Sequence, residues 1–157
     1  MTIKNRREAL TQLQAEVDVV IIGGGQAALA TAYFLKRKKI PFIILDDQSQ
    51  AGGAWSHAWE SLRLFSPNTW SSLSGWMMPT TEQIYPTRNE VIDYLSAYEQ
   101  RYQFPIIRPV HVDHIEQNDG YLDVYAGEQY WRAKAVVSAT GTWSQPHIPN
   151  DIGREKF

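Results

Sequence analysis

Near its start the chain carries two short apolar runs separated by an alanine-rich stretch. The first run, residues 17–22, is rich in Val and Ile and ends at three consecutive glycines, which is typical of a strand buried on both faces. Residues 26–38 place Ala28 and Ala32 on one side and lead into four basic residues, which favours a helix with cations at its negative end. A second buried strand follows at 41–45. This order predicts a right-handed βαβ unit with parallel strands.

Periodicity is lost between residues 48 and 87, where four of the six tryptophans lie. A long aromatic loop of this kind is often functional and can extend over a ligand. A helix is expected to begin after the loop and to run through Tyr98. Thr87 is its expected N-cap, and Glu90, three residues later, would complete a capping box.

The following part of the chain has the pattern of β structure. The turn Asn118-Asp119-Gly120 and the glycine at 127 separate runs of alternating apolar residues, which favours an antiparallel β-meander. Residues 135–140 predict a final buried strand. The expected fold class is therefore α/β, a Rossmann-like parallel sheet with helices on its faces and a β-meander. The predicted meander strands are residues 106–115, 121–125 and 129–134.

Composition narrows the possible functions. The 157 residues include 15 Lys and Arg, 17 Asp and Glu and no Cys, which suits one globular domain and excludes disulfides and thiol chemistry within them. We interpret residues 1–16 as a polar extension and 17–157 as the domain. Without a basic block, nucleic acid and membrane surfaces are poor partners. Since no apolar run approaches the roughly 20 residues of a bilayer span or follows a signal-peptide pattern, we expect a cytoplasmic protein.

The glycine turn carries the first chemical signal. Residues 23–28 read Gly-Gly-Gly-Gln-Ala-Ala, which matches Gly-x-Gly-x-x-Ala at a strand-to-helix junction. In such a turn Gly23 permits the tight bend, Gly25 lets the main chain approach a pyrophosphate, and small Ala28 permits close helix packing. The helix N-terminus adds free N–H donors and positive potential. We therefore predict that this turn binds a dinucleotide.

An acidic residue that could bind a ribose, and a histidine, are the other candidate site residues in this part of the chain. Asp46 ends the second strand at about the spacing expected for the acid that accepts a ribose hydroxyl, and Asp47 is the alternative. His57 is either a proton-exchange group near the predicted cofactor loop or a surface residue. His111 and His114 alternate on a predicted strand without a carboxylate in register, so we expect no metal site.

Three ordered motifs resemble a known family. The turn at 23–28 with Asp46, the Gly-Gly-Ala-Trp of residues 52–55 and the Ala-Thr-Gly of residues 139–141 are similar to the three FAD signatures of two-dinucleotide flavoproteins. Among these the resemblance is to flavin monooxygenases, in which Gly-Gly-x-Trp follows the ribose acid. Residues 59–67, 85–88 and 139–144 look most like the flavin monooxygenases encoded near arsenic-resistance genes. The resemblance covers residues 17–157, and it implies a three-layer ββα FAD-binding domain.

The resemblance also implies a set of contacts with FAD. The pyrophosphate would meet the first turn, the adenosine ribose would meet the acid, and the ribityl and ring side would meet the Gly-Gly-Ala-Trp segment. The main chain of Val112 would face the adenine, and the Ala-Thr-Gly segment would close over the cofactor. No catalytic residue is assigned. The implied cofactor-binding residues are Gly23, Gly25, Gln26, Ala27, Ala28, Asp46, Asp47, Gly53, Ala54, Trp55, Val112, Ala139, Thr140 and Gly141.

Members of this family continue into a second glycine-rich fold that binds NADPH, and no such fold occurs in these residues. We therefore expect the FAD-binding portion of an NADPH-using monooxygenase, incomplete for catalysis and acting on a small molecule that these residues do not identify. The alternative is a non-catalytic nucleotide-binding or self-associating module. Loss of the partner domain would leave apolar surface near residues 70–78, which predicts a homodimer. The same glycine turn would also suit a nicotinamide dinucleotide, although the second and third motifs favour FAD.

Overall fold

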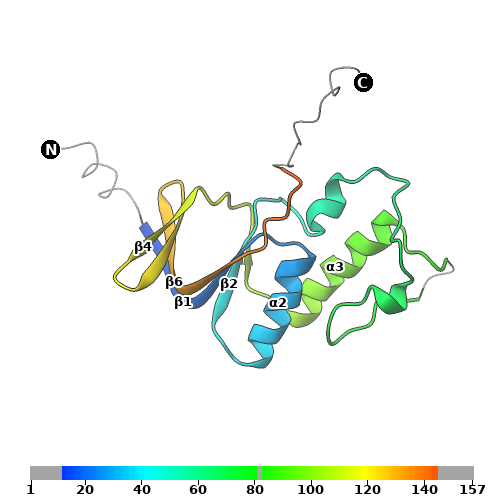
Figure 1. Cartoon of the computed structure of the whole chain (residues 1–157), viewed down its shortest axis with the longest axis horizontal. Helices are drawn as coiled ribbons and strands as arrows, with labels where there is room; N and C mark the ends of the chain where they lie inside the picture. Colours follow the sequence, from blue (N-terminus) through cyan, green and yellow to red (C-terminus); the bar gives the residue numbers. More distant parts are fainter. Residues whose placement is uncertain (1–11, 81–82, 145–157) are drawn as a thin grey trace, which may run out of the picture.

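A computed structural model describes residues 12–80 and 83–144. Its centre is one six-stranded sheet in the order β3-β2-β1-β6-β5-β4, flanked by two α-helices (Figure 1). The strands are β1 (Gln12–Ile22), β2 (Phe42–Leu45), β3 (Ile106–Ile107), β4 (His114–Asn118), β5 (Tyr121–Ala126) and β6 (Gln129–Ser138). The helices are α2 (Gln26–Arg37), α3 (Arg88–Tyr102) and the single 3-10 turns η1 (Gly53–His57) and η2 (Asn68–Trp70).

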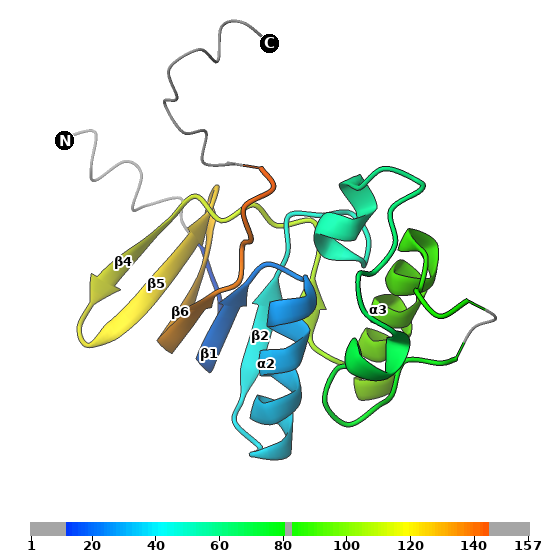
Figure 2. The same ribbon diagram turned by 45° about the vertical axis from the view of Figure 1, so that its right-hand side comes forward.

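Two apolar cores lie on opposite faces of the parallel strands. Because side chains alternate along a strand, Val19 and Ile21 of β1 pack with α2 and α3. Val20, between them, packs instead with Val124 and Trp131 of the meander. Both α-helices lie on one face, and β4, β5 and the start of β6 turn away from them (Figure 2). The α/β fold class with a parallel sheet and a meander is confirmed.

The first βαβ unit forms as the apolar pattern predicts. β1 pairs in parallel with β2 from Val19 to Ile22, and α2 connects them with Ala28 and Ala32 fully buried. The capping box that begins α3 is also confirmed. The Glu90 amide donates to the Thr87 hydroxyl at 3.3 Å, and the Thr87 amide donates to a Glu90 carboxylate oxygen at 2.7 Å. Neither α-helix in the described part of the chain is long and apolar enough to cross a bilayer.

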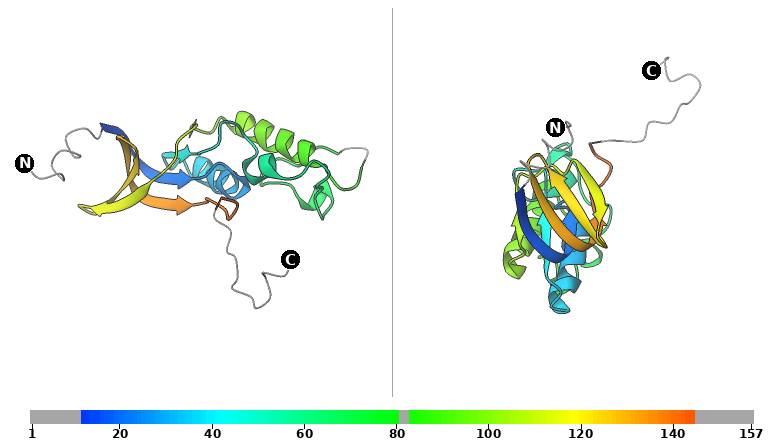
Figure 3. Two further views of the ribbon diagram at one scale, coloured as in Figure 1. Left: turned by 90° about the horizontal axis from the view of Figure 1, so that it is seen from above. Right: turned by 90° about the vertical axis from the view of Figure 1, so that its left-hand side faces the viewer.

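β1 begins earlier than its apolar run. It extends from Gln12, five residues before the predicted domain boundary, and its first half pairs in parallel with β6 from Gln129 onward. These positions are mostly exposed. They still form a strand, because a ladder of main-chain hydrogen bonds needs no apolar side chains. The described end of the predicted polar extension is thus a strand, while residues 1–11 lie outside the described part. The sheet curves strongly along this shared β1–β6 ladder (Figure 3).

Three strand predictions are wrong in their limits. The predicted strand at 106–115 is two strands, β3 and β4, separated by residues 108–113. Pro109 lacks an N–H for a ladder, and Arg108 directs its side chain to Asp46. The predicted strands at 129–134 and 135–140 are instead one continuous strand, β6. It pairs with β5 only from Gln129 to Ala133, so its second half, with Ala135 exposed, is less buried than predicted.

The meander is held by an ion pair across β5 and β6. Arg132 donates from Nε and Nη2 to the two carboxylate oxygens of Asp123, both at 2.7 Å. Asp123 is 1% exposed, and Asn118 adds a third hydrogen bond at 3.2 Å. The hydrogen bonds from Arg132 lower the pKa of Asp123 below its ordinary value, against an opposing effect of burial. The ionised carboxylate therefore stabilises the folded chain.

We expect Asp123→Asn to lower the free energy of unfolding at pH 6 and to have a smaller effect at pH 3. A carboxyl with a lowered folded-state pKa contributes stability above its unfolded pKa of about 3.9, and this contribution is lost as the pH falls through the folded value. Urea unfolding of both proteins at several pH values measures the difference. Asp119→Asn, at an exposed turn of the same meander, is the control. An effect of Asp123→Asn that is equal at both pH values would contradict the prediction.

Candidate functional site

The glycine turn at residues 23–25 lies where β1 ends and α2 begins. Gly23 has φ +100°, which L side chains rarely adopt, and a Cβ there would lie 2.5 Å from the Ala139 carbonyl oxygen. The Ala139 amide donates to the carbonyl of Ile22 at 2.8 Å. The end of β6 is thus packed directly against the turn, and Gly23 is required both for conformation and for space.

A second segment approaches the same turn from η1. A Cβ on Gly53 would lie 2.8 Å from the Cα of Gly25. Gly52 and Gly53 both have positive φ, +115° and +52°, so this loop reaches the turn with glycines in left-handed conformations. The structure therefore brings all three predicted motifs together, although they are far apart in the sequence. Main-chain contact between glycines is what permits the approach.

The N-terminus of α2 is open at this point. Gly25 is the N-cap and makes no side-chain cap, and no acidic residue lies in the first turn. Gln26 and Ala27 are exposed, whereas Ala28 is fully buried between helix and sheet. The unpaired first-turn amides and the helix dipole give this end positive potential. This is a suitable environment for an anion such as a phosphate.

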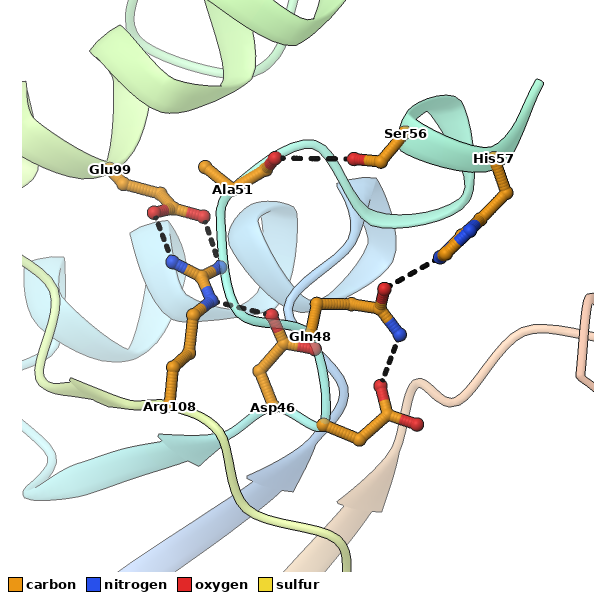
Figure 4. A network of polar contacts seen from close by, with 8 residues as sticks. Asp46, Gln48, Ala51, Ser56, His57, Glu99 and Arg108 are labelled. Carbon is orange, nitrogen blue, oxygen red and sulfur yellow. Dashed lines mark hydrogen bonds and ion pairs between the residues drawn. The ribbon is translucent and has the colours of Figure 1, made fainter. Parts of the chain in front are cut away.

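The two candidate ribose acids differ sharply in environment. Asp46 is 2% exposed at the end of β2, and its Oδ2 accepts a hydrogen bond of 2.6 Å from Arg108 Nε. Arg108 then donates from Nη1 and Nη2 to Glu99 of α3, at 2.8 and 2.7 Å (Figure 4). Asp47 is exposed and accepts from the Gln48 amide at 2.6 Å. Only Asp46 is held by a charged partner within hydrogen-bond distance.

Arg108 remains a cation in this network. Burial lowers the pKa of its guanidinium, but the hydrogen bonds to Glu99 and to Asp46 outweigh that effect and raise the pKa above its ordinary value. Two carboxylates and one guanidinium leave the cluster with one net negative charge. Such charge-assisted pairs are the strong class of protein hydrogen bonds.

A polar chain continues from Gln48 to η1. His57 Nε2 lies 2.6 Å from Gln48 Oε1 (Figure 4), and the imidazole stacks on Trp143 with ring centroids 6.1 Å apart. Arg88 holds the same turn from α3, donating to the carbonyls of Trp55 and Ser56 at 2.9 and 2.7 Å. η1 is therefore fixed to both the end of β2 and the start of α3.

The remaining predicted residues border this region. Trp55 is half-buried and packs against the helix-side core, while Ala54 and Thr140 are exposed. Val112 is half-buried in the segment that follows Arg108, where the Val110 amide donates to the carbonyl of Asp46 at 2.8 Å. Gly141 has φ +67° and open space around it.

Sequence reasoning missed Gly24 and Arg108. A Cβ on Gly24 would lie 2.2 Å from Asp46 Oδ2 and 2.6 Å from Arg108 Nη2, so the middle glycine makes room for the ion pair. Three successive glycines, where the motif asks for two, are the sequence signal that could have indicated Gly24. Nothing in the local sequence marks Arg108, because its partners lie on β2 and α3.

Two hollows lie beside the site. A cavity of about 170 Å³ reaches Gln26 at the start of α2 and is bounded by Leu64, Leu73 and Tyr94. An open groove of about 430 Å³ runs beside residues 61–65 and is lined by Trp59 and Tyr85. No group of three or more His, Asp and Glu side chains is placed to hold a metal within residues 12–80 and 83–144.

This chain is similar to known proteins in both sequence and structure. Residues 20–157 match the model of the pyridine nucleotide-disulphide oxidoreductase family. A flavin-containing monooxygenase from Stenotrophomonas maltophilia has a similar structure, with a TM-score of 0.86 and 48% identity over 92% of this chain and 44% of that protein. The described fold therefore occurs in a flavin enzyme of known structure.

Curated relatives agree with this match. A CzcO-like oxidoreductase of Geobacillus kaustophilus is 36% identical over 87% of this chain and 39% of its own length. A probable indole-3-pyruvate monooxygenase of Arabidopsis thaliana is 30% identical over 88% of this chain and 34% of its own length. The chain matches the N-terminal region of flavin-dependent monooxygenases and oxidoreductases and spans about 40% of their length.

We expect Gly23→Ala to lower the free energy of unfolding by about 2–5 kcal/mol. A left-handed residue with a Cβ costs roughly 1–2 kcal/mol, and overpacking against the Ala139 carbonyl adds about 1–3 kcal/mol. Gly120→Ala is a matched control, since Gly120 has φ +82° but nothing within 4 Å of its added Cβ. Urea unfolding measures both variants. Equal losses in the two would show that the contact with Ala139 contributes nothing.

Proposed function

Because this chain belongs to the pyridine nucleotide-disulphide oxidoreductase family, we propose that it forms the FAD-binding part of an NADPH-dependent flavin monooxygenase. The observation that carries the proposal is the meeting of three glycine-containing segments at the open end of α2. Residues 23–25, Gly53 and Ala139 come into main-chain contact there. The similarity to a flavin-containing monooxygenase at 48% identity supports the same cofactor class.

The residues present fit a dinucleotide. Gly23 and Gly53 are required by packing alone, because a Cβ on either would collide with main-chain atoms. Gly25 differs, since its φ is −82° and its added Cβ would meet only ordinary contact at 3.9 Å. The fold would accept alanine at this position. A glycine there is explained by a ligand whose pyrophosphate approaches the main chain.

Each side of the cradle would hold one part of FAD. The amides of Gly25, Gln26 and Ala27 would donate to the pyrophosphate, where the positive end of α2 favours an anion. Asp46 would accept a hydrogen bond from a hydroxyl of the adenosine ribose. Asp47 lies outside the ion pairs of Arg108 with Asp46 and Glu99.

The remaining segments would enclose the rest of the cofactor. The Val112 main chain would face the adenine. The flavin side would lie along Gly53, Ala54 and Trp55, and the end of β6 would close over it with Ala139, Thr140 and Gly141.

The cofactor, when bound, supplies hydride acceptance from NADPH and the activation of oxygen toward a small-molecule substrate. The protein binds and orients it. Arg88 fixes η1 through two carbonyls, which holds Gly53 against the turn. Half-buried Trp55 and the stacked pair of His57 and Trp143 would shield that side from water. The NADPH site and the substrate contacts would belong to the portion of the relatives that this chain does not span.

We expect the purified chain to retain FAD after incubation and gel filtration, seen as flavin absorbance that elutes with the protein. Gly25→Ala should weaken FAD binding by about tenfold or more, because the methyl group occupies the approach to the main chain. Its free energy of unfolding should stay within about 1 kcal/mol of the unchanged protein. Stability and binding are measured on the same preparations.

Gly120→Ala, in the distant meander turn, is the control and should retain FAD. Protein that elutes colourless after incubation with FAD would contradict the proposal. Equal FAD affinity of Gly25→Ala and the unchanged chain would contradict the assigned role of the turn.

The chain also exposes a large apolar surface, which we propose associates two copies. Phe65 and Trp59, exposed to 92% and 62%, line the open groove, and Trp70, exposed to 85%, lines the cavity that reaches Gln26. Contiguous exposed apolar area of this kind marks interaction surfaces. Within the predicted stretch at 70–78, Trp70 and Met77 are exposed but Met78 is buried, and Trp59 and Phe65 add exposed apolar side chains outside that stretch.

We expect light scattering to give a dimer mass at high protein concentration. The double substitution Phe65→Ser and Trp70→Ser should shift the mass to that of a monomer, because both side chains are exposed and contribute little to the core. Leu13→Ser, at an exposed apolar residue in β1, is the control. A monomer mass for the unchanged chain at high concentration would refute the association.

A further inference from the structure

We propose that Arg108 is a positioning residue for the nucleotide site, which anchors Asp46 to α3 through Glu99 and so aims the free carboxylate oxygen at the adenosine ribose. The inference rests on the proposed FAD-binding function and adds a residue that none of the three glycine motifs contains. Arg108 follows β3 directly and joins Asp46, at the end of β2, to Glu99 of α3 (Figure 4).

The contacts of Arg108 define one orientation. Its Nε donates to Asp46 Oδ2 at 2.6 Å, while Nη1 and Nη2 donate to the two oxygens of Glu99 at 2.8 and 2.7 Å. The three side chains are 15%, 3% and 11% exposed. A bidentate pair fixes the plane of the guanidinium, so the direction of Nε, and with it the position of Oδ2, is set by the anchor on α3.

Gly24 further restricts the position of the Asp46 carboxylate. A Cβ at this glycine would lie 2.2 Å from Asp46 Oδ2 and 2.6 Å from Arg108 Nη2, so the ion pair lies directly on the main chain of the turn. Within the described residues, no hydrogen bond is made to Asp46 Oδ1. One oxygen is therefore held, and the other is left to accept a hydroxyl beside the turn that would hold the pyrophosphate.

The charge of the cluster also suits a ribose with free hydroxyls. Arg108 compensates the burial of two carboxylates, which would otherwise be costly, and one net negative charge remains. A 2′-phosphate would meet this charge unfavourably, whereas a hydroxyl can donate to it. Lysine could not replace the arginine, because a point charge on a flexible stem lacks the planar fork that reaches both partners.

The test compares the affinity for FAD with that for an analogue whose adenosine carries 2′-deoxyribose. Flavin fluorescence anisotropy measures both ligands with each protein. The unchanged chain should prefer FAD by about tenfold, as for one charge-assisted hydrogen bond. Arg108→Lys should reduce this preference below about threefold, as should Asp46→Asn. If the role of Arg108 were purely structural, Arg108→Lys would lower the affinity for both ligands equally and leave the ratio of the two affinities unchanged.

Arg101→Lys is the matched control. Arg101 lies on the same helix as Glu99 but stacks over Trp76, 5.1 Å from the ring centroid, and its substitution should leave the ratio unchanged. Glu99→Gln is a second variant that keeps both members of the Asp46–Arg108 pair and loses a charge of the anchor. It should give an intermediate ratio even if Arg108→Lys does not fold.

The outcomes separate the two proposals. An unchanged chain that binds FAD without preferring it over the deoxy analogue would overturn the inference alone. An unaltered preference for FAD in Arg108→Lys would also overturn the inference. If Arg108→Lys does not fold, an unaltered preference in Glu99→Gln would overturn it instead. Failure of the unchanged chain to bind FAD at all would overturn the proposed function, and the inference with it.

Discussion

Main-chain contact at residues 23–25 is the constraint on which this structure depends. β1 and β6 must end at the same level for Ala139 to reach Gly23, and η1 must turn back toward the sheet for Gly53 to reach Gly25. Side chains on Gly23 and Gly53 would hold the segments apart. The absence of a Cβ therefore determines where β1 ends, where α2 begins and where the long loop first returns to the sheet.

The polar network of Asp46, Arg108 and Glu99 contacts the same turn. Gly24 contacts the Asp46–Arg108 pair, so each of the three glycines in the turn has a different neighbour. Gly23 faces the end of β6, Gly24 faces the ion pair and Gly25 faces η1. Packing explains the first two, whereas Gly25 has room for a methyl group.

Features set by local chemistry could be predicted from the sequence. The β-branched run, the glycine turn and the alanine-rich stretch gave the first βαβ unit, and the Thr87–Glu90 spacing gave the capping box. The turn at Asp119 and Gly120 joined β4 and β5 as expected, with positive φ at both residues. In each case neighbouring residues in the chain decide the structure, so a short window contains the information.

Features set by distant partners could not be predicted in this way. The first half of β1 is polar, and only its pairing with β6 makes it a strand. Residues 106–115 look like one strand, but Arg108 leaves the sheet to meet partners on β2 and α3. The motifs identified most of the candidate site through resemblance. They did not reveal its electrostatic support, because Arg108 belongs to no local pattern.

The pairing of β1 with β6 also has a consequence for the order of folding. Gln12 and Gln129 are register partners, so the ladder joins segments made at very different times during synthesis. Such distant contacts close slowly, since loop entropy is lost before they form. The βαβ unit can assemble early, but the glycine turn lacks one of its walls until residue 139 has emerged from the ribosome. The meeting of the three segments at this turn is therefore a late product of folding, completed only after the helices and the first strands have packed.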